Sequence, residues 1–212
     1  MSPVSTASGP SGTPFCGVWG IERATTLWDM LKEQEIVVKQ TKVVGRDEFA
    51  IETPTGELLG TARQTLKMSD IVKASRGVEV FDAAGTHVLS IEDPVNFFRD
   101  TYVVHLVNPP MELARLTQRF AWIGSKFDVE VAGFPEVQVE GKVFQLNYTL
   151  TSQGRPIASV DAEFSGVGRA VMGKTNYRVR MQPGLDERQH AAVIGVALAI
   201  DMRRAKMRRR SG

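Results

Sequence analysis

Polar and apolar residues alternate along most of the chain, from Ile36 to Gln182. Successive side chains of a β-strand point to opposite faces, so this period of two is typical of strands with one buried face. The alternation is cleanest in Phe127–Val131 and Ile157–Phe164, where acidic or hydroxyl side chains separate the apolar ones. The predicted strands are Ile36–Lys42, Phe49–Glu52, Leu58–Thr65, Val78–Phe81, His87–Ile91, Tyr102–Val107, Leu113–Phe120, Phe127–Val131, Val137–Val143, Gln145–Thr151, Ile157–Phe164 and Asn176–Gln182.

Short turn sequences separate these strands. Asp82-Ala83-Ala84-Gly85 predicts a hairpin, and Pro54-Thr55-Gly56 and Pro183-Gly184 are further turn signals. Short turns join antiparallel neighbours, so one antiparallel sheet of ten or more strands is expected. A long open sheet exposes two edges, and closure on itself removes them. The sequence therefore predicts a mainly β fold, a closed antiparallel barrel.

A second pattern begins near the end of the chain, where Ala191–Ile200 is apolar at every position. Asp186 can cap a helix start, and Glu187 places negative charge at the same end. A helix that is apolar all round must be covered on every side, and ten residues are too few for a bilayer, which needs about 20. We therefore predict that helix 186–205 is the central plug of the barrel. Its expected core residues are Val193, Ile194, Val196, Ala197, Leu198 and Ile200.

The remaining segments complete the predicted organisation. Residues 1–20 are rich in Ser, Pro, Gly and Thr and are expected to be a disordered leader. A single domain is expected over 21–205, opening with a short helix at Ala24–Lys32, and 206–212 is expected to be a basic tail.

Composition limits the class of protein. The 212 residues are 42% hydrophobic and 24% charged, which fits one ordinary globular domain. Cys16 is the only cysteine, so no intrachain disulfide can form, and a reducing, cytoplasmic compartment is expected. The N-terminus carries no secretory pattern. A net charge of +2 argues against a dedicated nucleic-acid binder.

One stretch matches a nucleotide-binding motif. Gly168–Thr175 has the P-loop spacing of Gly, four residues and Gly-Lys-Thr, in which backbone amides and a following helix cradle phosphates. The following segment, Asn176–Gln182, alternates like a strand and ends at Pro183. We interpret the match as a Gly-rich connection between strands.

Other catalytic signatures are missing from the sequence. His87, His105 and His190 are scattered, and no spacing of His, Cys, Asp and Glu suggests a metal cage. No Gly-x-Ser-x-Gly elbow is found. We expect a protein that is not an enzyme and has no metal or other cofactor.

Basic residues are concentrated at the C-terminus: Arg203, Arg204, Lys206, Arg208, Arg209 and Arg210. This cluster has three interpretations: a solvated tail that complements the end of the helix, contact with an anionic membrane, or nucleic-acid binding. Two smaller basic pairs, Lys39/Lys42 and Arg115/Arg119, lie on predicted strands. They could line a head-group patch or belong to ordinary outward faces, and we favour outward faces.

The C-terminal segment also carries a family likeness. Gly184–Asp201 resembles the C-terminal helix of the phospholipid scramblases and is similar to that of the plant and bacterial LURP-one-related proteins, with the bacterial branch nearer. The strand–Asp-x-x-Gly–strand unit at Phe81–Gly85 and the strand Tyr177–Pro183 fit as well. The likeness covers about Ile36–Arg204. It implies a Tubby C-terminal-like fold, a twelve-stranded barrel threaded by a hydrophobic helix, in a family associated with membrane phospholipids.

The sequence departs from the scramblases in ways that bear on function. It lacks their Pro-rich arm and cysteine cluster, and their acidic calcium segment is reduced here to Asp186. Calcium needs six to eight oxygen ligands, so no calcium site is expected. The predicted function is peripheral binding of anionic phospholipid head groups at the inner membrane face. The alternatives are a scaffold barrel that binds a protein partner and, third, an active scramblase.

Overall fold

The structure is a computed structural model that describes residues 30–42, 47–67, 75–94, 100–119, 126–163 and 175–211. At 42, 66–67, 75–76, 119, 126 and 209–211 it describes the backbone alone. The predicted leader, Cys16 and most of the predicted helix Ala24–Lys32 lie outside these residues. The strands are β1 (Glu35–Lys42), β2 (Glu48–Glu52), β3 (Leu58–Lys67), β4 (Ser75–Asp82), β5 (His87–Asp93), β6 (Thr101–Leu106), β7 (Met111–Arg119), β8 (Lys126–Val131), β9 (Phe134–Lys142), β10 (Asn147–Ser152), β11 (Arg155–Ala162) and β12 (Asn176–Met181).

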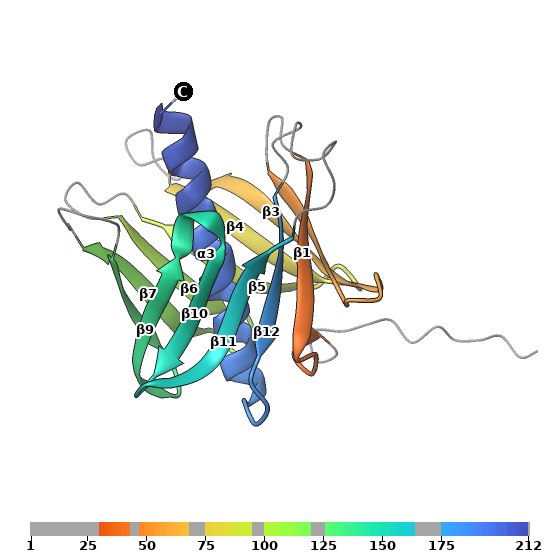
Figure 1. Ribbon diagram of the computed structural model, residues 1–212. Helices are drawn as coiled ribbons and strands as arrows, with labels where there is room; N and C mark the ends of the chain where they lie inside the picture. Colours follow the sequence, from red (N-terminus) through yellow and green to blue (C-terminus); the bar gives the residue numbers. More distant parts are fainter. Residues whose placement is uncertain are drawn as a thin grey trace, which may run out of the picture.

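These strands form one closed antiparallel barrel (Figure 1). Each strand pairs with its neighbour in sequence, and β1 closes the ring by pairing with β12. A 3-10 turn, η1 (Val143–Gln145), separates β9 from β10. Helix α3 (Glu187–Ser211) runs through the barrel. The predicted fold class, a closed barrel of about twelve strands around a C-terminal helix, is confirmed.

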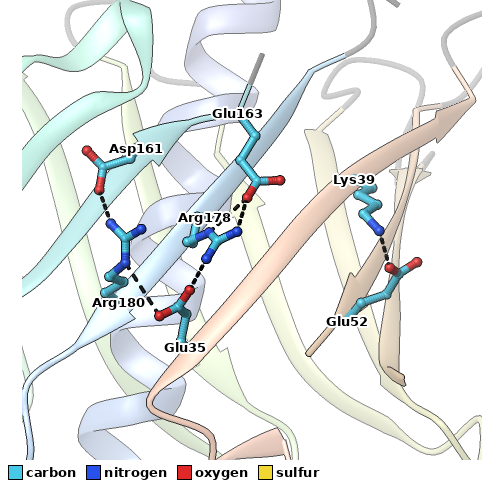
Figure 2. Close-up of polar contacts among 7 residues, drawn as sticks. All are labelled: Glu35, Lys39, Glu52, Asp161, Glu163, Arg178 and Arg180. Carbon is cyan, nitrogen blue, oxygen red and sulfur yellow. Dashed lines mark hydrogen bonds and ion pairs between the residues drawn. The ribbon is translucent and has the colours of Figure 1, made fainter. Parts of the chain in front are cut away.

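Ion pairs reinforce the seam at which the barrel closes (Figure 2). Arg178 of β12 bonds to Glu35 of β1 on one side and to Glu163, just after β11, on the other. These two carboxylates raise the pKa of Arg178 above its usual value. The neighbouring Arg180 lies 2.8 Å from Asp161 and 3.4 Å from Glu35. These side chains are partly exposed, so each pair stabilises the seam by only about 0–1 kcal/mol.

The core lies between the inner faces of the strands and the apolar half of α3. Every residue from Ala191 to Ile200 is buried. The predicted core residues have exposed fractions between 0% and 2%: Val193, Ile194, Val196, Ala197, Leu198 and Ile200. Burial of each large aliphatic side chain stabilises the fold by roughly 1.5–3 kcal/mol.

The helix start is capped as the sequence predicts. The Gln189 N–H donates to Oδ1 of Asp186 at 2.8 Å, and the Asp186 N–H donates to Oε1 of Gln189 at 2.9 Å. This reciprocal arrangement is a capping box, which satisfies donors that the first helical turn leaves open. Gln189 also donates through Nε2 to the carbonyl of Gly133, in the turn between β8 and β9. The cap therefore fixes the helix start to the barrel wall.

The helix does not sit centrally in the barrel. It packs most closely against β5, β6 and β7, with further contacts to β12 and η1. Gly195 allows this approach, because a Cβ at that position would lie 2.3 Å from Cγ1 of Val104 on β6. Glycine is therefore required for packing here and not for an unusual backbone conformation.

The C-terminal end of α3 differs from the prediction. The helix continues to Ser211, so residues 206–211 are its last turns and not a separate tail. Helix-forming Lys, Met and Arg residues continue the helix beyond 205. One of these residues, Lys206, is also held by ion pairs with Asp93 on β5 and with Asp100 just before β6.

Candidate functional site

The helix changes character at Asp201, directly after its apolar run. Asp201 has an exposed fraction of only 3%. Its environment includes the phenols of Tyr148 on β10 and Tyr177 on β12, together with Arg204, whose Nη1 lies 3.5 Å from Oδ1 of Asp201. Both phenol hydroxyls are buried and make no hydrogen bond within the described part of the chain. The apolar plug thus ends in a buried polar cluster of one carboxylate and two phenols.

Burial dominates the electrostatics of this cluster. It raises the pKa of Asp201 to about 6, although the charges of Arg204 and Arg208 act in the opposite direction. Burial also raises the pKa of Tyr148 and of Tyr177 well above the usual value, and the Asp201 charge adds to both shifts. The folded protein therefore holds a proton on Asp201 more tightly than the unfolded chain does.

Asp201→Asn is expected to stabilise the protein near pH 8 by up to about 3 kcal/mol and to have little effect near pH 4. An acid with a raised folded-state pKa binds more protons in the folded than in the unfolded state. Stability from this group therefore falls as pH rises from about 4 through about 6, and the substitution removes that loss. Urea denaturation of both proteins across this range measures the difference. The same shift at both pH values would contradict a titrating Asp201.

A second polar cluster joins the helix to β5, β6 and β7. Nε and Nη2 of Arg203 donate to Oε1 of Gln118 at 3.1 and 2.7 Å, and Nε lies 3.4 Å from Asp100. Lys206 Nζ lies 2.8 Å from carboxylate oxygens of both Asp93 and Asp100. Arg203 is buried, with an exposed fraction of 5%. These cations therefore bind the helix to the rim of the barrel.

These contacts change the interpretation of the C-terminal basic residues. Arg204 donates to the Thr175 hydroxyl at 2.9 Å in addition to its contact with Asp201. Arg203, Arg204 and Lys206 thus bond to groups of the protein, and they lie before the last turn of α3 rather than at its carbonyl end. The remaining cations, Arg208, Arg209 and Arg210, lie in the last turns, which project past the strands in Figure 1. Arg208 is exposed, and the side chains of the other two are outside the described set.

The predicted basic pairs on the strands lie far apart. Lys39 is on β1 and Arg115 on β7, and six strand-to-strand steps separate β1 from β7 in either direction around the twelve-stranded ring. Lys39 is paired with Glu52 (Figure 2), and Arg115 Nη2 lies 2.7 Å from Glu112. The side chains of Lys42 and Arg119 are outside the described set. The two sites therefore cannot form one patch on the barrel wall.

Thr175, the described residue of the P-loop-like stretch, is buried and bonded to β1. Residues 164–174, including Lys174, lie outside the described ranges. The Thr175 N–H donates to Oε1 of Gln40 at 3.1 Å. The segment that follows is the strand β12, as predicted, whereas a P-loop continues into a helix.

Two of the histidines, His87 and His190, also take part in local contacts. Nε2 of His87 lies 3.1 Å from the Leu89 carbonyl and 3.1 Å from the Ser90 hydroxyl. Nδ1 of His190 lies 3.0 Å from the Asp186 carbonyl. Among the residues that the structure describes, no group of three or more His, Cys, Asp and Glu side chains is placed to hold a metal ion.

A groove of about 1280 Å³ lies along β7, β8 and β9. Phe127, Phe134 and Val139 line it, with buried valines beneath, and five acidic side chains also line it: Glu112, Asp128, Glu130, Glu136 and Glu140. Among the lining residues whose side chains the structure describes, Arg115 is the one cation. The sequence alone does not reveal this groove, because the groove depends on how β8 and β9 pair.

A family model described as LURP-one-related matches residues 34–201, from just before β1 into the polar end of α3. The chain belongs to the LURP-one-related family. The match covers the barrel and the apolar part of the helix, so it agrees with the likeness seen in the sequence. Comparison of this LURP-one-related chain with curated proteins and with solved structures found no match in either set. Within the described residues, no helix is both long enough and apolar enough to cross a membrane.

Proposed function

We propose that this LURP-one-related protein is a non-enzymatic module that binds anionic phospholipid head groups through the projecting end of α3. The observation that carries the proposal is the position of Arg208, Arg209 and Arg210. They occupy the last turns of the helix, beyond the strands. The resemblance to the scramblases supports the same class of ligand.

The physical basis is attraction between arginine and an anionic surface. Each basic residue near such a membrane contributes about 1 kcal/mol to binding. The acidic side chains of the groove lie on the wall of the barrel, so a membrane would meet the basic helix end more favourably than that wall. We expect the protein to bind end-on at the cytoplasmic face of the membrane, without calcium, and neither to move lipid between leaflets nor to bind nucleic acid.

Co-sedimentation with vesicles tests the proposal. The protein is expected to bind phosphatidylcholine vesicles that contain phosphatidylglycerol and not vesicles of phosphatidylcholine alone. The triple substitution Arg208→Gln, Arg209→Gln and Arg210→Gln should weaken binding roughly 100-fold at low salt, from three contributions of about 1 kcal/mol. Addition of EDTA should have no effect.

A second triple substitution controls for total charge: Arg63→Gln, Lys142→Gln and Arg155→Gln. These three side chains are exposed on the barrel. They change the net charge by the same amount as the helix-end substitutions, and binding should stay within about threefold of the wild type. Equal loss in the two triple variants, or equal binding to both kinds of vesicle, would rule out recognition by the helix end.

A further inference from the structure

We propose that the groove along β8 and β9 binds an extended basic segment of a partner protein, which inserts as an additional strand. This is independent of lipid binding, because the groove is lined by residues of β7, β8 and β9 and not by the end of α3. Three properties of the groove carry the inference: an interrupted strand ladder, an apolar floor and an acidic rim.

The ladder between β8 and β9 is the least complete in the barrel. Across the described residues it pairs only Val129 with Val137 and Val131 with Phe134, with an irregularity between these pairs. On their other sides the same strands are fully engaged, since β7 pairs with β8 along Lys126–Val131 and β10 pairs with β9 along Val137–Lys142. Within the described residues, the ladder of these two strands is therefore confined to the part next to their connecting turn. Unpaired strand backbone is a template for an added strand.

The position of the helix explains why the floor of the groove remains accessible. The helix lies closest to β5, β6 and β7, so β8 and β9 receive less packing from it. Phe127, Phe134 and Val139 are only partly buried at the groove, although they pack against the core. Three apolar side chains therefore remain available for contact with apolar side chains of a ligand.

The rim determines the charge of the ligand. Glu130, Glu136 and Glu140 are exposed and line the groove. Glu136 accepts a hydrogen bond from Gln138 at 2.8 Å, and Glu140 accepts one from Thr151 at 3.4 Å. Both donors are neutral and leave the carboxylate charges in place. This charge favours lysine and arginine side chains and disfavours anionic lipid.

Strand geometry combines these features into a sequence pattern. Side chains of an inserted strand would point alternately toward the apolar floor and toward the acidic outer face. The expected ligand is therefore a segment in which apolar and basic residues alternate. The turn at the end of the groove is fixed by the hydrogen bond from Gln189 to Gly133. We expect the groove to be largely formed before the ligand arrives.

Fluorescence anisotropy with two labelled synthetic peptides tests this inference. One peptide alternates lysine and valine, and the other has the same composition in separate blocks of lysine and valine. The alternating peptide is expected to bind about tenfold more tightly near physiological salt, because only it can place valines on one face of a strand. In its presence, amide hydrogen exchange of Gln138–Lys142 should slow.

The matched variants separate the groove from general electrostatics. The triple substitution Glu130→Gln, Glu136→Gln and Glu140→Gln should weaken binding of the alternating peptide about tenfold. A control triple substitution changes the net charge by the same amount at positions outside the groove: Glu33→Gln, Glu57→Gln and Glu79→Gln. It should change the affinity for the alternating peptide by less than about twofold. Equal binding of both peptides, equal loss in both variants, or unchanged exchange in Gln138–Lys142 would overturn the inference. So would self-association of the protein alone that the groove variant abolishes, since the occupant would then be a second copy.

Discussion

Val196→Asp is expected to prevent folding. Val196 is fully buried in the apolar run of α3. An isolated carboxylate there would lose its hydration without gaining a partner, which places the substitution among those costing more than about 4–5 kcal/mol. Asp201 illustrates the difficulty in the same helix, because even with Arg204 beside it burial raises the pKa of Asp201 to about 6. Total stability of 5–15 kcal/mol is typical of a domain, so most or all of it would be lost.

Circular dichroism and soluble yield measure this effect. Arg188→Asp is a matched control, because it introduces the same residue in the same helix at an exposed position. It lies in the first turn, where negative charge interacts favourably with the helix dipole, so its melting temperature should be unchanged or slightly higher. A soluble Val196→Asp protein that melts with the wild type would show that the helix is not enclosed by the barrel.

Gly195→Ala is expected to destabilise the protein by roughly 2 kcal/mol, despite the higher helix propensity of alanine. Propensity alone favours alanine by about 1 kcal/mol. The new Cβ would lie 2.3 Å from Cγ1 and 3.1 Å from Cγ2 of Val104. Val104 is fully buried and β-branched, so its side chain has little freedom to move aside, and overpacking typically costs about 1–3 kcal/mol or more. Close packing therefore outweighs propensity at this position.

A double-mutant cycle isolates this contact. Val104→Ala alone should cost about 1–3 kcal/mol because it leaves a cavity. Combined with Gly195→Ala it should cost at least about 1 kcal/mol less than the sum of the single substitutions, since the added methyl occupies space that the valine vacated. Urea denaturation gives all four free energies of unfolding. Strict additivity, or a more stable Gly195→Ala protein, would contradict the close approach of α3 to β6.

Much of the fold could be predicted from the sequence because it depends on local patterns. Alternation located all twelve strands, although individual ends differ by a few residues. For example, the segment expected at Leu58–Thr65 forms β3 as far as Lys67. The apolar run from Ala191 located the helix, and Asp186 its start. The alternation of polar and apolar residues and the capping of a helix both depend on residues that are close together in the chain. They can therefore be recognised in a single sequence.

The candidate site was less predictable because its contacts join distant parts of the chain. Lys206 bonds to Asp93, which lies 113 positions earlier, and Arg203 bonds to Gln118. Without knowledge of how the strands are arranged, the partners of these basic residues could not be identified, and one interpretation of the residues was a solvated tail. In the sequence, Asp201 is distinguished only as a charged residue directly after an apolar run. Its buried neighbours Tyr148 and Tyr177 come from β10 and β12, and only the closed barrel brings them near it.

The strands of this LURP-one-related protein enclose the apolar part of α3. Amide hydrogen exchange tests it most directly. Amides of Val193–Leu198 are expected to exchange only through global unfolding, at the rate of the most protected residues in β6 and β12. Exchange in Val193–Leu198 as fast as in an unstructured peptide would contradict the enclosure.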